Sequence, residues 1–443
     1  MRPVSPTARR ERILAVLAVA TAFSARAEDP ASPPPSARPL ADPPQLTLPR
    51  SHLLGDWFGA RTWLEARGVT PTVTFVTDAL GNPSGGQQHG FTATNNLGVD
   101  VLFDLGKLFG LAGGSFEASF SERFGSSLSR DDIGNAFSVQ QIFPGTYRLV
   151  QLAYRQELPG DRLELRLGRM AVGDDFMVSA YSCVFVQNGF CGNPVGIFFN
   201  APGMTAYPAA TWGALVKVRP TARAYAMAGV YNGDPAIRDD SHHGADFSMN
   251  GPVFAIGEVG YQLNSLPGDS GPIGNYKAGF WYDHSRYTDF TTVAPGQTSS
   301  ASRGNWGIYG QLDQVLVQFG GPRSVRGFGI MASVLASPDA SVSQMPFFVN
   351  AAFVIRGLFP SRPMDVGGFG VVYGYFSGDL RDAQRRAQQP AQEHETALEL
   401  TYRLRFLGDA LFFQPDVQYV IQPGGTGVIG DAFVAGLQVG VNL

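Results

Sequence analysis

Charged residues are scarce in this chain of 443 residues. Asp, Glu, Lys and Arg together make up 16% of it, below the roughly 25% that is usual in soluble domains. The formal net charge is −4, which gives no electrostatic basis for binding nucleic acid. After the N-terminal region the sequence also lacks any uninterrupted apolar run of about 18 residues, so it contains no signal for a transmembrane helix.

Groups suited to metal or covalent chemistry are few as well. The six histidines form no H-E-x-x-H motif, and His242-His243 has the surroundings of a loop. Asp174-Asp175 is more typical of a solvated loop end than of a calcium site. Residues 425–430 match G-x-G-x-x-G but lie between two strand-like segments instead of opening a helix. We therefore predict no metal, no cofactor and no enzymatic activity.

Glycine and aromatic residues, by contrast, are plentiful, at 54 residues and 12% of the chain. The last stretch, 432–443, alternates strictly: Phe433 and Leu437 share one parity, and Gln438 and Asn442 share the other. A period of two indicates a strand whose faces meet different solvents. Apolar-out, polar-in strands in a Gly-rich chain with few charges are typical of a transmembrane β-barrel. A soluble all-β protein is the alternative that composition leaves open.

The N-terminal region has three parts. Residues 1–27 have the pattern of a secretory signal peptide, because three arginines precede a short apolar run that ends in an Ala-Arg-Ala cleavage site. Residues 28–50 are rich in Pro and Ala and predict an extended or disordered linker. Residues 51–68 have helical spacing and predict an amphipathic helix, either packed on a surface or placed as a plug at the periplasmic mouth.

About sixteen alternating segments between residues 69 and 443 predict the fold class, an all-β transmembrane antiparallel β-barrel. The segments lie near 69–79, 94–104, 114–124, 147–157, 162–169, 212–219, 223–231, 253–262, 276–284, 305–317, 326–335, 347–356, 367–376, 395–404, 412–421 and 432–443. Connections after odd-numbered segments are mostly long, and those after even-numbered segments are mostly short. This sorting is expected when the loops face outside and the turns face the periplasm.

The polar parity of these segments carries most of the charges, which we expect to face a wet lumen, because charge on the lipid face is costly. A barrel of this size is wide enough for an aqueous channel. Lumen donors, acceptors and aromatic faces are what a weakly bound sugar needs. The candidate sugar-contacting residues are Glu117, Arg123, Arg155, Arg166, Arg169, Trp212 and Trp281. The alternative for each is an ordinary lumen residue in a structural ion pair.

The two cysteines, Cys183 and Cys191, both lie in the long connection 170–211. Behind a signal peptide the compartment is oxidising, so we expect them to form a disulfide. Two free thiols or a metal-binding pair are the alternatives. A stapled loop of about 40 residues is long enough to fold into the pore and narrow it.

With these features in place, the chain resembles the family of OprB-type carbohydrate-selective porins. The resemblance covers nearly all of the predicted mature chain. It is carried by LGDWFGARTWLEARG at 54–68, LGRMAVGDDF at 167–176, Cys183 with CGNP at 191–194, Tyr207-Pro with TWG at 211–213, VYNGDP at 230–235, and QPDVQY at 414–419 with Pro423-Gly-Gly425. The resemblance implies a roughly sixteen-stranded outer-membrane channel for passive sugar uptake.

The function expected from all of this is passive, selective diffusion of carbohydrates, monosaccharides such as glucose, across the bacterial outer membrane after signal-peptide export. The expected partners are carbohydrate substrates and the surrounding outer-membrane lipids and lipopolysaccharide, with assembly of three barrels left open and nucleic acid excluded. A general or anion-preferring porin is the first alternative. An outer-membrane barrel enzyme is the alternative from another class.

Overall fold

The computed structural model describes residues 52–238, 242–266, 268–294, 299–321, 324–408 and 410–443. The chain divides into two units, residues 1–38 and 39–443, and only the second contains described residues. The predicted signal peptide, 1–27, and the predicted linker, 28–50, lie outside the described residues.

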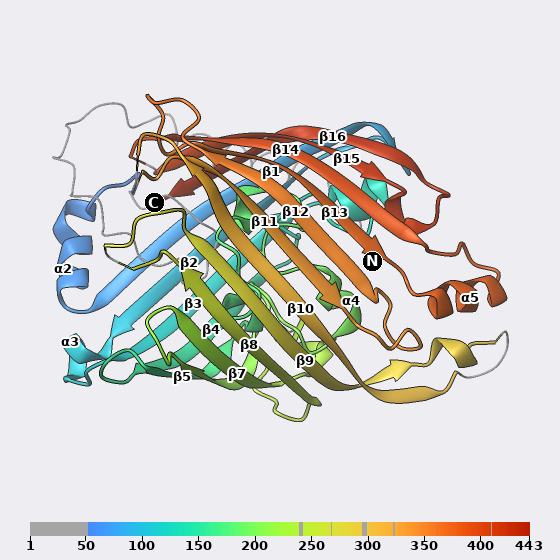
Figure 1. The fold of residues 1–443 in the computed structure, drawn as a ribbon, viewed down its shortest axis with the longest axis horizontal. Coiled ribbons are helices and arrows are strands. Elements are labelled where there is room, and N and C mark those ends of the chain that lie inside the picture. Colours follow the sequence, from blue (N-terminus) through green and yellow to red (C-terminus); the bar gives the residue numbers. More distant parts are fainter. Residues whose placement is uncertain (1–51, 239–241, 267, 295–298, 322–323, 409) are drawn as a thin grey trace, which may run out of the picture. The chain divides into compact units, whose positions relative to one another are not determined.

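Sixteen antiparallel strands form one closed barrel, in which every strand pairs with its neighbours in sequence and the last pairs with the first (Figure 1). This confirms the predicted fold class. The strands are β1 (Val69–Gly86), β2 (Phe91–Asp104), β3 (Gly114–Gly125), β4 (Tyr147–Glu157), β5 (Leu163–Met170), β6 (Thr211–Val218), β7 (Ala224–Asn232), β8 (Val253–Leu263), β9 (Gly274–Thr288), β10 (Ala301–Gln318), β11 (Gly327–Ala336), β12 (Phe347–Arg356), β13 (Val366–Tyr375), β14 (His394–Phe406), β15 (Leu411–Ile421) and β16 (Gly430–Asn442).

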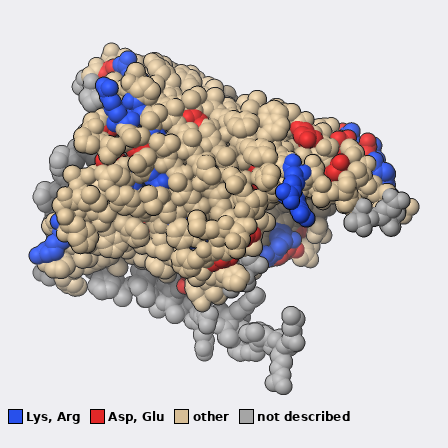
Figure 2. Space-filling model, turned by 90° about the horizontal axis from the view of Figure 1, so that it is seen from below, with Lys and Arg blue, Asp and Glu red and all other residues tan. Residues whose placement is uncertain are grey.

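In strand β16, the alternating residues of the sequence point to opposite faces of the barrel wall. It pairs with β1 from Thr74↔Asn442 onward and so closes the barrel. Phe433 is exposed on the outer wall, whereas Val434 and Gln438 are buried inside. On the face shown in Figure 2, charged side chains are few over most of the surface. The wall therefore presents apolar side chains outward and polar ones inward, as the alternation predicts.

The first hairpin differs from the prediction, which ended its strands at 79 and 94. In the structure β1 continues to Gly86 and β2 begins at Phe91. The Asn82 amide donates to the carbonyl oxygens of Gly85 and Gln88, and it thereby holds the irregular strand end. Gly85 has a φ of +75°, a conformation that favours glycine. Bulges of this kind break strict alternation, so the pattern alone hides the extra residues.

The helices are short. They are η1 (Trp57–Gly59), α2 (Ala60–Ala66), α3 (Leu105–Phe109), η2 (Ser129–Ile133), η3 (Val172–Asp174), η4 (Ser182–Val184), α4 (Gly196–Asn200), η5 (Pro235–Arg238), η7 (Phe290–Thr292), α5 (Gly378–Arg386) and η8 (Pro423–Gly425). Within the described ranges, none of them has the length and hydrophobicity needed to cross a bilayer.

The predicted N-terminal helix is shorter in the structure and is tied to the barrel closure. Its α-helical part is α2, because Gly59, the last residue of η1 and the N-cap of α2, has a φ of +91° and interrupts the helix. Arg61 of α2 is buried and donates to the carbonyl oxygens of Leu443 (2.7 Å) and Pro71 (3.1 Å). The Leu53 N–H donates to the carbonyl oxygen of Asn442 (2.7 Å). The segment thus clamps the two strands that close the barrel.

We predict that Arg61→Ala weakens this clamp and lowers the free energy of unfolding by about 2 kcal/mol, because hydrogen bonds from a charged donor are lost. The measurement is the temperature at which the folded barrel loses its fast electrophoretic mobility. Arg67→Ala is the matched control, since Arg67 lies at the end of α2 and is exposed. An Arg61→Ala barrel as heat-resistant as the control would contradict the clamp.

Candidate functional site

Two long loops, 126–146 and 171–210, fold into the barrel and fill part of its lumen. Most residues between 176 and 205 are buried. Phe185 and Phe190 of the second loop belong to one apolar cluster with inward residues of the wall. The wall makes room for these rings: a Cβ on Gly368 or Gly370 would lie 2.5 Å from the ring of Phe185 or Phe190, respectively. Where these loop residues pack against the wall, the lumen is filled by side chains. The strand count alone suggested a barrel wide enough for an open aqueous channel.

Cys183 and Cys191 form the expected disulfide, and both are buried. The backbone beside this disulfide is bound by polar side chains of the wall. Arg403 donates to the carbonyl oxygen of Cys183 (2.8 Å), and Gln414 donates to that of Val184 (2.8 Å). The stapled turn is therefore fixed against β14 and β15.

Carboxylates of the inner wall bind the backbone N–H groups of both loops. Glu399 accepts from Val186 (2.6 Å) and Gln187 (3.0 Å) of the second loop. Glu395 lies four residues before Glu399 on β14 and points to the same side of the sheet. It accepts from Ala136 (2.7 Å) and Phe137 (2.8 Å) of the first loop. Each carboxyl group spans two neighbouring N–H groups, an arrangement that gives its oxygens partners and fixes the loop backbone.

Four further carboxylates on the wall repeat this contact with one N–H group each. The pairs are Glu258 with Met177 (2.9 Å), Asp313 with Ala180 (3.1 Å), Asp283 with Gly203 (2.6 Å) and Asp78 with Ile142 (2.9 Å). We refer to Asp78, Glu258, Asp283, Asp313, Glu395 and Glu399 as the anchor carboxylates. The sequence indicates that they face inward, because each lies on the polar parity of its strand, but it does not indicate what they bind.

Arg166 is the centre of the most extensive charged network. Only 2% of its side chain is exposed. It donates to Asp175 (2.7 Å) at the start of the second loop, to Glu117 (3.1 Å) on β3 and to Gln151 (2.8 Å) on β4. Gln151 in turn donates to Asp174. Arg166 is thus fully occupied in holding the loop to the wall, whereas Glu117 keeps 21% of its side chain exposed.

Arg155 and Arg123 also face inward but differ in access. Arg155 lies 3.5 Å from Glu164 and keeps 33% of its side chain exposed. Arg123 is buried, donates to Asn96 (3.1 Å) and lies over the ring of Tyr207, 5.2 Å from its centroid. Arg155 is therefore open to a solute, and Arg123 supports the loop.

Two of the seven candidates, Arg169 and Trp212, lie on the outward parity of their strands. Arg169 is three residues after Arg166 and so has the opposite parity, that of Leu167, but unlike the exposed Leu167 it is buried, with Arg148 and Asp246 as charged neighbours. Trp212 pairs with Arg169 in register and packs on Phe247 (5.6 Å between centroids). Counting the alternation through β5 would have revealed this placement in advance.

Trp281 faces inward, but none of its surface is exposed. It lies in the apolar cluster with residues of the second loop. In this arrangement it packs the loop and offers no free face to a sugar ring.

Partly exposed polar side chains facing the lumen gather near the short-turn ends of four of the strands between β2 and β6. We define the vestibule residues as Asp100 on β2, Glu117 on β3, Arg155 on β4 and Lys217 on β6. The register places them near one another, because Asp100 pairs with Ser119, two residues from Glu117, and Glu164, the ion-pair partner of Arg155, pairs with Lys217. A solute entering this end of the barrel meets two acids, on β2 and β3, beside two bases, on β4 and β6.

Asp174 links the loop network to pH. Burial raises the pKa of this carboxyl to about 8, and the nearby carboxylates of Asp175, Glu117 and Asp100 act in the same direction, whereas Arg166 opposes them. Asp174 is therefore protonated at neutral pH. In the unfolded chain this carboxyl has an ordinary pKa of about 4, so the stability that its neutral form gives the folded protein is fully present below about pH 4 and is lost progressively as the pH rises to about 8.

We predict that the ion selectivity of the barrel shifts toward cations between pH 7 and pH 9, because ionised Asp174 adds a negative charge beside the vestibule. Reversal potentials in planar bilayers measure this shift. Asp174→Asn should abolish it, and Asp382→Asn, at an exposed position of α5, should leave it in place. A shift that persists in Asp174→Asn would show that another group titrates.

Comparison with known proteins agrees with this architecture. Residues 88–443 match the family model described as "Carbohydrate-selective porin, OprB family". Porin B of Pseudomonas aeruginosa is 28% identical over 428 residues, which cover 87% of this chain and 90% of that protein. A putative porin, QuiX, of Acinetobacter baylyi is 27% identical over 432 residues, covering 89% of this chain and 93% of the relative.

Among solved structures, the high-pH structure of Pseudomonas putida OprB superposes with a TM-score of 0.82 at 24% identity, covering 89% of this chain and 99% of the other. The fold is therefore shared across the whole barrel. The resemblance found in the sequence is confirmed, and so is the location in the bacterial outer membrane. This chain belongs to the OprB family of carbohydrate-selective porins.

Proposed function

We propose that this barrel passes monosaccharides such as glucose by passive diffusion, and that the vestibule residues make the weak contacts that favour sugars. The observation that supports the proposal is the division of the inward polar groups. The anchor carboxylates and Arg166 are occupied by loop contacts, whereas Glu117 and Arg155 keep exposed surface. The groups left open to a solute therefore include both donors and acceptors.

This mixture suits a neutral polyol. A sugar hydroxyl both donates and accepts, so a guanidinium and a carboxylate on neighbouring strands satisfy it together. Because Arg155 and Glu117 each have a protein partner, neither presents an uncompensated charge that would trap an ion. Contacts of this kind are weak and allow release, as conduction requires.

A general or anion-preferring porin is the second candidate, and one observation favours it. Arg155 and Lys217 keep exposed surface in the vestibule, and Lys277 and Arg356 are partly exposed on the same inner wall. Four cations of this kind would attract anions. We propose a channel over a barrel enzyme because the anchor carboxylates bind loop backbone and are not available as general acids or bases.

We also propose two kinds of partner for the outer wall of the barrel. Outer-membrane lipids and lipopolysaccharide would surround the apolar wall, and two further copies of the chain would contact it in a trimer. Native mass spectrometry of the detergent-solubilised protein measures both.

The test of the proposal is liposome swelling with a monosaccharide, a disaccharide and an amino acid of similar size to the monosaccharide. The proposal expects the monosaccharide to enter fastest. Arg155→Ala should slow its entry about fivefold, because the loss of a hydrogen bond worth roughly 1 kcal/mol changes the contact by that factor. Glu117→Ala should have a similar effect on the sugar.

Arg385→Ala, at an exposed position of α5, is the control and should leave the swelling rates unchanged. Equal rates for the sugar and the size-matched amino acid would replace the proposal with a general porin. A folded barrel that gives no swelling would overturn the channel itself.

A further inference from the structure

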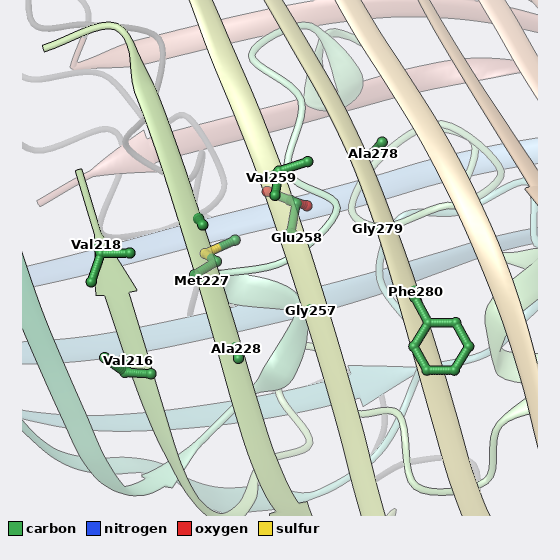
Figure 3. A pocket seen from close by; sticks show the side chains of 11 residues that line it. Val216, Val218, Met227, Ala228, Gly257, Glu258, Val259, Ala278, Gly279 and Phe280 are labelled. Carbon is green, nitrogen blue, oxygen red and sulfur yellow. The ribbon is translucent and has the colours of Figure 1, made fainter. Parts of the chain in front are cut away.

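The outer wall contains an apolar hollow that the channel function does not explain. It lies over β6–β9 and has a volume of about 540 Å³ (Figure 3). Its lining comes from Gly, Ala and Val residues on these four strands, together with Met227, Phe280 and the lumen-facing Glu258. A hollow of this kind differs from the lumen, because its open side faces away from the barrel interior.

The strand register explains why the wall is hollowed at this place. One row across the wall reads Val216, Ala228, Gly257 and Phe280, and the row below it reads Val218, Ala226, Val259 and Ala278. Small residues on β7 and β8 form the floor. Val216 and Phe280 stand at the two ends of the first row, and Val259 projects from the middle of the second; Val259 and Phe280 are 57% and 47% exposed.

The depth of the hollow follows from the strand ends. β6 ends at Val218 and β7 begins at Ala224, at the short turn, which faces the periplasm in an outer-membrane barrel. Below the two rows, Ala224, Tyr261 and Tyr276 form the next row, and both tyrosines are exposed. Tyrosines in such a position mark the membrane–water interface. The hollow therefore lies at hydrocarbon depth in the inner leaflet.

Charges of both signs lie at the interface just below it. Arg223, in the turn before β7, forms an ion pair with Asp269 (2.6 Å), and the Arg223 side chain stays 39% exposed. Arg223 also interacts with the side chain of Tyr261. An exposed cation beside an anion matches the phosphate and the ammonium of a zwitterionic headgroup.

We propose that this hollow binds one acyl chain of a zwitterionic glycerophospholipid of the inner leaflet, with the phosphate beside Arg223. An apolar chain is the occupant that the position dictates, since the hollow offers almost no hydrogen-bonding groups and opens toward lipid tails. The charges beneath it match a headgroup in sign and in depth. The site goes beyond the proposed sugar transport and does not depend on it.

The test is native mass spectrometry of the full barrel, extracted from membranes in mild detergent, with a phosphorus assay of the retained lipid. We expect the wild-type barrel to retain one phospholipid. Ala228→Phe fills the hollow and should reduce the retained fraction at least tenfold. Ala351→Phe makes the same change on the outer wall of β12, away from the hollow, and should retain lipid like the wild type.

Arg223→Gln keeps the hollow but removes the cation, and it should lower the retained fraction by several-fold. Swelling rates and heat-modifiable mobility should stay at wild-type values in all three variants, which separates this site from the channel. Equal retention by Ala228→Phe and Ala351→Phe would overturn the lipid site. A wild-type oligomer that Ala228→Phe dissociates would overturn it in favour of a second copy of this chain.

Discussion

A carboxylate on the inner wall that accepts backbone N–H groups from an inward loop is the contact on which the lumen depends. A sixteen-stranded barrel is wide enough to stay open, so loops within it need fixed attachments. A buried hydrogen bond contributes roughly 1 kcal/mol, and Glu395 and Glu399 each accept two from an inward loop. Because these acids belong to one strand, β14, they place both loops relative to each other as well as to the wall.

This attachment divides the lumen into two regions. Toward the long loops, apolar rings such as Phe185 and Phe190 pack against glycines of β13, and the space is filled. Toward the short turns, polar side chains such as Glu117 and Arg155 keep exposed surface. The packed region fixes the width of the path, and the open region sets which solutes are favoured along it.

Much of this architecture could be predicted from local sequence, because alternation is a property of each strand alone. The sixteen strands and the Cys183–Cys191 disulfide follow from pattern and compartment. The placement of Arg169 could also have been predicted, since three residues separate it from the inward Arg166. The anchor role of Glu399 could not, because its partners Val186 and Gln187 lie more than 200 residues away. The burial of Trp281 could not be predicted for the same reason, because the loop residues in its apolar cluster come from elsewhere in the chain.

The central claim, that anchor carboxylates set the path by holding the loops, is tested most directly by single-channel conductance of a Glu395→Ala/Glu399→Ala variant in planar bilayers. Glu393→Ala is the control, since that carboxylate is exposed and binds Arg381. The account predicts a conductance well above that of the wild type, with less discrimination between monosaccharide and disaccharide. A folded double variant with the conductance and discrimination of the wild type would contradict it.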